Sequence, residues 1–399
     1  MKLSRRFLEH GVRKCFIQKP QMFFTFVTGF LRTVKMNRKV ISDDKLYEIL
    51  PVIEQSERVA LDTEADSIHC YPEKLCLIQI SIPEFDILID PLKNQNLEPL
   101  WEILKDKLIV FHAADYDIRL LYKTYRFVPS KIFDTMHGAR LLGYKQVGLS
   151  DLVKKYFGVK LEKSHQKANW TTRPISPALL EYAVNDTRYL LQLADTLRNE
   201  LIQKNRLGWH EETCERLIFH IVQSVDSENG EMWRLPGSST LSPLGLSVLK
   251  EIWAWRENEA LTSNKPPFFI LPHNQLVLIA EAAAKSRDFM YYIPKNFSAR
   301  KTSELIQAVE RGLKTPPDKR PAQIRNNGEH LPAHKIAFLN KLIKFRNNIA
   351  LSLKVDPSLI ASRAELLGIV KNPENAQEIL MNWQFELLKE AIKNTEDNS

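Results

Sequence analysis

The sequence has few cysteines and few glycines, and its N-terminal apolar run is too short to cross a membrane. The four cysteines, Cys15, Cys70, Cys76 and Cys214, show no Cys-x-x-Cys spacing, so neither a zinc site nor a disulfide framework is predicted and a reducing compartment is expected. Only 13 glycines and 21 prolines occur in 399 residues, which excludes a collagen-like or low-complexity chain. The apolar run covers residues 22–31, whereas a membrane-spanning helix needs about 20 residues. No membrane partner is therefore expected.

The remaining composition is that of a globular protein with a basic surplus. Hydrophobic residues make up 44% and charged residues 26% of the chain, and 399 residues suit two or three domains. The formal net charge is +8. Such a balance favours a polyanionic partner, although it is also common in proteins that bind nothing acidic.

Residues 1–39 form a basic extension with almost no acidic residues. Three interpretations stay open: the apolar part of a signal sequence, an organellar transit peptide, or a natural start at Met36. No small-residue cleavage site follows the apolar run, so the signal sequence is the least favoured of the three. The pattern of a folded domain begins at about Val40.

The stretch Arg58–Asp66 places two carboxylates at the end of an apolar run. Residues 59–61 predict a short buried strand, and strand periodicity puts Asp62 and Glu64 on one face with Thr63 pointing away. Two like charges on a buried face repel unless a cation lies between them, and a hard divalent metal ion suits oxygen ligands. The alternative is a strand end that leads into a solvated turn.

Strands and helices alternate after this stretch. Residues 74–82 and 85–90 predict a β-hairpin, and a helix at 97–105 precedes a strand at 107–112. This order predicts an α/β layer architecture. After the strand, Asp117 opens a helix, where a capping acid is the ordinary interpretation.

A later helix carries Tyr182 and Asp186 on one face, because residues four apart are neighbours on a helix. Together with Asp-Thr-Glu at 62–64 and the segment His112–Leu121, it resembles the three motifs of the DnaQ-like 3′-to-5′ exonucleases. A histidine at position 181 would mark one subclass of that family. This chain has Glu181 followed by Tyr182, which corresponds to the tyrosine subclass.

The resemblance implies a ribonuclease H-like mixed sheet with two divalent metal ions, Mg²⁺ or Mn²⁺, at its catalytic site. Asp62 would bridge the metals, Glu64 and Asp186 would complete the first site, and Asp117 would serve the second, partly through water. Such ions generate a nucleophile at neutral pH and offset charge on the leaving oxygen. A tyrosine is too weak a base at its ordinary pKa of about 10, so Tyr182 would orient the attacking water.

Other polar residues near these motifs have weaker predictions attached to them. Asp134 is expected to cap a helix, and the adjacent acids Asp66 and Asp115 are expected to be solvated. A strand-end histidine and a basic loop with one aromatic residue could contact substrate, although hydrogen bonding and solvation are the ordinary alternatives. These candidate substrate contacts are His112, Lys163, Lys167, Trp170 and Arg173.

The C-terminal half predicts helices only. A tryptophan-containing helix at 244–259, followed by Lys-Pro-Pro, Leu271-Pro272 and a helix at 275–286, resembles the helicase-and-RNase-D C-terminal (HRDC) domain, a nucleic-acid-binding module. Residues 333–393 repeat this outline in weaker form. The expected domains are the extension at 1–39, an exonuclease domain at 40–207, a first HRDC domain with a lead-in helix at 208–313, a linker at 314–330 and a second HRDC-like domain at 331–399.

This layout resembles the ribonuclease D family. The resemblance implies a cytoplasmic, monomeric 3′-to-5′ exoribonuclease that trims structured RNA with a free 3′ end, such as tRNA precursors, and releases nucleoside 5′-monophosphates. Two alternatives are a DNA exonuclease and an inactive RNA-binding protein. The sequence does not separate RNA from DNA, because no residue pattern reports recognition of the 2′-hydroxyl. An inactive protein would be expected to have lost one of the five motif residues, and none is lost. Two departures are the basic extension and Asn169 before Trp170, where an aspartate is expected. An organellar location follows if the extension is a transit peptide.

Overall fold

The computed structural model describes residues 39–41, 43–93, 96–162, 168–227, 230–323 and 331–393. Residues 1–38, Lys163 and Lys167 lie outside these ranges, and so do the predictions made for them. Residues from Val40 onward form one compact unit. None of the described helices is both long and apolar enough to cross a membrane.

A six-stranded mixed sheet forms the centre of the N-terminal domain, with strand order β1-β4-β3-β2-β5-β6. The predicted hairpin is confirmed, since β3 and β4 pair antiparallel. Strand β2 pairs antiparallel with β3 and parallel with β5, which in turn pairs parallel with β6. The strands are β1 (Lys39–Ile41), β2 (Arg58–Asp66), β3 (Lys74–Ile82), β4 (Phe85–Ile89), β5 (Leu108–Phe111) and β6 (Lys131–Asp134).

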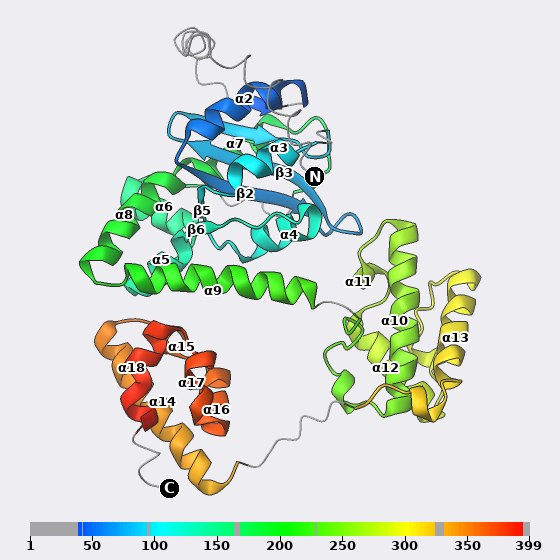
Figure 1. Cartoon of the computed structure of the whole chain (residues 1–399). Coiled ribbons are helices and arrows are strands. Elements are labelled where there is room, and N and C mark those ends of the chain that lie inside the picture. The colour runs from blue at the N-terminus through cyan, green and yellow to red at the C-terminus, as the bar shows by residue number, and fades with distance from the viewer. Residues whose placement is uncertain are drawn as a thin grey trace, which may run out of the picture. The chain divides into compact units, whose positions relative to one another are not determined.

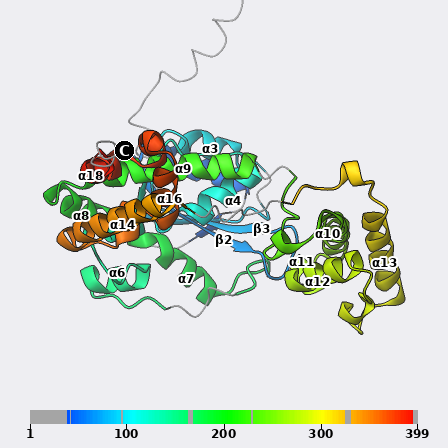
Figure 2. The same cartoon turned by 90° about the horizontal axis from the view of Figure 1, so that it is seen from below.

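Helices cover both faces of this sheet, and Figure 2 shows α7 on the opposite side of β2 and β3 from α3 and α4. The side chains of Val59 and Leu61 of β2 pack with apolar residues of α3 and α4 on one face of the sheet. Ala60, which lies between them, packs with apolar residues of α5 and α8 on the other face. The predicted α/β layers are therefore confirmed. The helices of this domain are α2 (Asp43–Gln55), α3 (Glu98–Leu104), α4 (Asp115–Tyr125), α5 (Thr135–Leu142), α6 (Leu149–Phe157), α7 (Pro177–Arg188), α8 (Leu190–Gln203) and α9 (Leu207–Asp226).

Helix α9, which begins at the predicted boundary of 207/208, packs against the sheet domain. Its buried residues Cys214 and Ile221 belong to the apolar cluster under α2, α3 and α4, and the Nε2 of His210 lies 3.0 Å from the Asp134 carbonyl. An amphipathic pattern does not reveal which neighbour a helix will cover. The lead-in helix therefore belongs structurally to the sheet domain.

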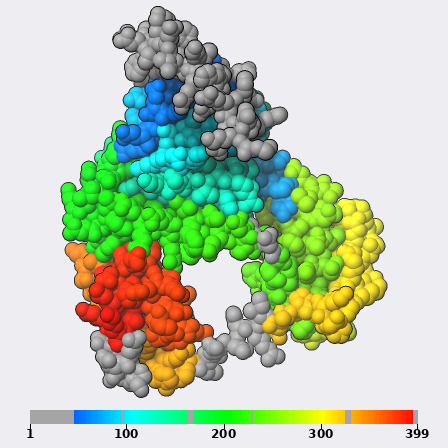
Figure 3. All heavy atoms as spheres, viewed as in Figure 1, coloured from blue at the N-terminus to red at the C-terminus, as the bar shows by residue number. Residues whose placement is uncertain are grey.

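The remaining helices form two sets with the same internal order (Figure 1). Figure 3 shows the atoms of the first set in yellow-green to yellow and those of the second in orange to red. In each, a long helix ends at a residue with positive φ, Asn264 or Lys354, and a short helix begins at a proline. A hydrogen bond from an arginine also recurs, from Arg256 to the Leu271 carbonyl and from Arg346 to the Ala361 carbonyl. This recurrence supports the predicted tandem. The sets are α10 (Pro243–Ser263), α11 (Pro267–Ile270), α12 (His273–Ala284) and α13 (Ala299–Leu313), then α14 (Ala333–Leu353), α15 (Pro357–Ile360), α16 (Arg363–Lys371), α17 (Ala376–Ile379) and α18 (Asn382–Lys393).

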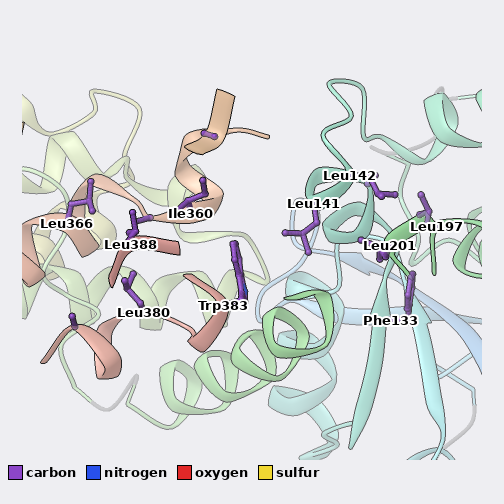
Figure 4. Close-up of a cluster of buried hydrophobic side chains, with 14 of the residues drawn as sticks. Phe133, Leu141, Leu142, Leu197, Leu201, Ile360, Leu366, Leu380, Trp383 and Leu388 are labelled. Carbon is purple, nitrogen blue, oxygen red and sulfur yellow. The ribbon is translucent and has the colours of Figure 1, made fainter. Parts of the chain in front are cut away.

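An apolar cluster joins the second helical set to the sheet domain (Figure 4). It runs from Phe133 and Leu201 to Trp383 and Leu388. Trp209 on α9 stacks on Trp383 of α18 with ring centroids 4.8 Å apart. The sheet domain and this helical set therefore share buried apolar surface, the main favourable term in folding.

Candidate active site

Strand β2 places Asp62 and Glu64 on the face covered by α7. The strand is anchored by fully buried apolar residues at 59–61, and Asp62 and Glu64 lie opposite Gln79 and Leu77 of β3. The register shifts between Glu64 and Ala65, and pairing resumes with Ala65 opposite Leu75, so the irregularity lies directly after the second carboxylate. Such irregularities often occur next to active sites, where they redirect a side chain.

Helix α7 brings Asp186 to the same place. Its buried residues Ala183 and Val184 pack on β3 and β4. At its C-terminal end, the Thr187 hydroxyl lies 2.8 Å from the Ser81 hydroxyl of β3, and Arg188 forms an ion pair with Asp86 of β4. These contacts fix the helix turn that carries Asp186.

One carboxylate oxygen each from Asp62, Glu64 and Asp186 lies within 4.8 Å of the others. Burial, followed by the charges of Asp186 and Asp117, raises the pKa of Glu64 to about 9. Burial and the Asp117 charge raise the pKa of Asp186 to about 7, and burial with three neighbouring acids raises that of Asp62 well above its ordinary value. Clustered, desolvated oxygen donors suit a divalent cation, which offsets their mutual repulsion.

Asp117 lies outside this group of three but next to β2. It is 5% exposed, and one of its oxygens accepts hydrogen bonds from the Thr63 backbone N–H and hydroxyl. Burial raises the pKa of Asp117 to about 7, although the bonds from Thr63 act in the opposite direction. The sequence offered no signal for the partner of Thr63, because a strand pattern shows only that its side chain leaves the face of Asp62.

Tyr182 lies one helical turn before Asp186, and its ring packs near Trp170 with centroids 6.2 Å apart. Trp170 is 2% exposed. The structure therefore argues against the predicted base contact by Trp170 and gives it a packing role beneath Tyr182. The burial of this loop depends on distant residues, which no local sequence pattern shows.

Arg173 connects the loop that carries Trp170 to the sheet. Its guanidinium pairs with Asp90, which is 1% exposed, and donates to the carbonyls of Trp170 and Cys76. All these partners belong to the sheet or to the loop itself. In the structure Arg173 therefore holds the loop against β3, and its phosphate contact stays a prediction.

The remaining polar residues singled out in the sequence are one histidine and three acidic residues near the site. His112 is half-buried, its Nδ1 lies 2.8 Å from the Thr135 hydroxyl, and burial lowers its pKa. Asp134 caps α5 as predicted, and Asp115 is exposed and pairs with Arg119. Asp66 was expected to be solvated, but it is 2% exposed and accepts backbone bonds from the turn after β2.

Comparisons with known proteins match both parts of the chain. A family model of the 3′-5′ exonuclease matches residues 37–202 and an HRDC domain model matches residues 245–306. Ribonuclease D of Xanthomonas oryzae is 32% identical over 343 residues, covering 84% of this chain and 92% of the relative. The chain belongs to the ribonuclease D family. Ribonuclease D of Bartonella henselae is 28% identical over 376 residues, covering 90% and 89% of the two chains.

A ribonuclease D also shares the fold. The crystal structure of Escherichia coli RNase D, an exoribonuclease involved in structured RNA processing, superposes with a TM-score of 0.73 at 24% identity and covers 90% of this chain and 98% of that one. Family membership confirms the predicted 3′-to-5′ exoribonuclease, a hydrolase with an HRDC domain. Its nucleic-acid substrate is accordingly RNA.

Proposed function

We propose that the protein trims the 3′ ends of structured RNA such as tRNA precursors and releases nucleoside 5′-monophosphates. The observation that carries this proposal is the cluster of Asp62, Glu64 and Asp186, with Asp117 buried beside it. The involvement of the Escherichia coli relative in structured RNA processing supports the substrate class. The sequence alternatives of a DNA exonuclease and an inactive binding protein become outcomes of the test below.

The acidic residues fit a pair of Mg²⁺ or Mn²⁺ ions, because all of them offer oxygen ligands. Asp62, Glu64 and Asp186 would hold one ion, and Asp117 would help to hold the second, with Asp62 shared between them. Bound ions would supply an activated water and offset the charge on the leaving oxygen. Tyr182, on the helix turn before Asp186, would orient that water through its hydroxyl group.

The chain itself would deliver and hold the RNA end. The HRDC domain would bind the RNA backbone. His112 stays a candidate for contact near the scissile phosphate, because it lies at the end of β5 just before the helix that carries Asp117. We further propose a cytoplasmic monomer, with an organellar location as the alternative if residues 1–39 are a transit peptide.

The test is digestion by the purified full chain of a 3′-extended tRNA, single-stranded RNA and single-stranded DNA, each with Mg²⁺ or Mn²⁺. We expect stepwise loss of 3′ nucleotides from the RNA substrates, release of 5′-monophosphates and complete inhibition by EDTA. Preference for DNA would instead favour the DNA exonuclease, and binding without hydrolysis would favour the inactive protein.

Variants connect the activity to the acidic cluster. Asp186→Ala should abolish hydrolysis with the fold retained, because it removes one of the clustered carboxylates. The matched control is Asp115→Ala, since Asp115 is an exposed neighbour that pairs only with Arg119 among the described residues. Full activity of Asp186→Ala would refute the proposed mechanism.

A further inference from the structure

Gln79 in the middle of β3 is fully buried, with 0% of its surface exposed. Neither its amide nitrogen Nε2 nor its amide oxygen Oε1 has a hydrogen-bond partner among the described residues. A buried polar group without a partner is destabilising, and the large majority of buried side-chain polar atoms in proteins are paired. Gln79 is therefore an exception that needs a physical reason.

The strand register places this amide on the face of the acidic cluster. Gln79 lies directly opposite Asp62 in the antiparallel ladder, and opposite residues of such a ladder project to the same face with Cβ atoms about 5 Å apart. Its neighbours two positions away on β3 are Leu77, opposite Glu64, and Ser81, opposite Ala60. Gln79 thus lies in the same layer as the carboxylates.

The other side chains around Gln79 leave Asp62 as its natural partner. Leu77 and Leu88, which is paired with Gln79 across the next strand, offer no polar atom. The Ser81 hydroxyl is already bonded to Asp86 and Thr187. Ala183 and Val184 of α7 cover this face and are apolar.

We propose that Gln79 is a positioning residue of the metal centre, whose Nε2 donates to the Asp62 carboxylate when a divalent cation is bound. This inference rests on the proposed metal role of Asp62. An ionised carboxylate accepts hydrogen bonds at both oxygens, so a donor on one side leaves the other free to bind a cation. A neutral amide suits this task, because it orients the carboxylate without neutralising the charge that attracts the metal.

Gln79→Met keeps the length of the side chain and removes its polar atoms. We expect this change to maintain or raise the stability of the metal-free protein and to weaken its binding of Mn²⁺. In EDTA, the melting temperature should stay the same or rise, because an unpaired buried amide is gone. With Mn²⁺, the dissociation constant measured by calorimetry should increase about 10- to 100-fold, the usual effect of losing an outer partner of a ligand. The metal-dependent rise in melting temperature should shrink accordingly.

Gln384 in α18 provides a matched control. It is also buried, at 3% exposure, but its Nε2 donates to the Leu359 carbonyl and its Oε1 accepts from the Met381 N–H. Gln384→Met should therefore lower the melting temperature in EDTA and leave Mn²⁺ affinity unchanged. Gln79→Asn is a second variant, which keeps an amide one methylene shorter and should also weaken Mn²⁺ binding.

Either of two results would overturn the proposal. One is wild-type Mn²⁺ affinity of both Gln79 variants, and the other is a loss of melting temperature in EDTA for Gln79→Met equal to that of Gln384→Met, which would show a merely structural amide. Because Mn²⁺ binding is measured without RNA, it is independent of the substrate proposal. Wild-type protein that binds Mn²⁺ but hydrolyses no RNA would refute the proposed function and leave the role of Gln79 intact.

Discussion

Thr63 donates two hydrogen bonds to one carboxylate oxygen of Asp117, from its backbone N–H at 3.0 Å and from its hydroxyl at 2.6 Å. Strand β2 thus uses both of its faces at the site. One face carries Asp62 and Glu64, and the residue between them holds the fourth carboxylate from α4. The central threonine of the Asp-Thr-Glu motif therefore has a structural reason to be a hydroxyl residue.

Thr63→Val should raise the pKa of Asp117 above its present value of about 7, because a bond that favours the ionised carboxylate is lost. The stability at pH 8, measured by urea unfolding, should fall by about 1.5 to 3 kcal/mol, the range for hydrogen bonds to charged groups. The alkaline shift should appear in the pH dependence of Mn²⁺ binding as affinity lost at pH 6 to 7 and partly regained at pH 9. Thr196→Val is the control, since the Thr196 hydroxyl bonds only its own helix at Gln192 among the described residues.

The stability of the metal-free protein should fall as the pH rises from about 4 to 7. Folded Asp186 keeps its proton up to pH about 7, whereas the unfolded chain releases it near the ordinary value of 3.8. Between these values the folded state binds one more proton, so the free energy of unfolding decreases by about 1.4 kcal/mol per pH unit for this group. Denaturant unfolding in EDTA at several pH values measures the slope. It should be smaller in Asp186→Asn, and an equal slope in both proteins would contradict the prediction.

The sequence was sufficient to predict which side chains share a face of one strand or one helix. The alternation at 59–64 predicted that Asp62 and Glu64 share a face, and helix spacing predicted the same for Tyr182 and Asp186. Strand β2 and helix α7 have these arrangements. The periodicity of apolar and polar residues can be recognised in the sequence alone, so these predictions needed no knowledge of the tertiary packing.

Long-range partners could not be predicted in the same way. Trp170 was expected at the surface, but the ion pair between Arg173 and Asp90 spans 83 residues of sequence and pulls its loop onto the sheet. Gln79 resembles any other strand residue until the register places it opposite Asp62. Pairing across strands depends on the tertiary fold, which no local pattern specifies.

Trp170→Phe should lower kcat for RNA by about 10- to 100-fold, since small misplacements of catalytic groups have effects of this size. The KM for RNA should stay unchanged, because Trp170 is 2% exposed and lies under Tyr182. Steady-state kinetics separate the two constants. The effect should largely disappear in a Tyr182→Phe background, whereas a direct contact between Trp170 and RNA would raise KM in both backgrounds.

Asp134 holds two elements of the site region at once. Oδ1 accepts from Met136 and His137 at the start of α5 and also, at 3.3 Å, from the Ala113 N–H. Oδ2 accepts a second bond from the turn before α4, from the Ala114 N–H at 2.7 Å. That second bond fixes the turn before α4, where Ala113 has a φ of 65°, a conformation unfavourable for residues other than glycine.

Asp134→Asn should keep the α5 cap, because the amide oxygen replaces Oδ1, but it directs an amide NH₂ at the Ala114 N–H. Stability should fall by about 1 to 3 kcal/mol, and hydrolysis should fall further than unfolding alone explains, because α4 carries Asp117. Urea unfolding and RNA hydrolysis at a temperature where the variant is folded distinguish these effects. Asp356→Asn is the matched control, since Asp356 caps the short helix α15 through the Ser358 N–H at 2.8 Å and is expected to leave hydrolysis unchanged. Equal hydrolysis by folded Asp134→Asn and Asp356→Asn would show that the turn before α4 does not position Asp117.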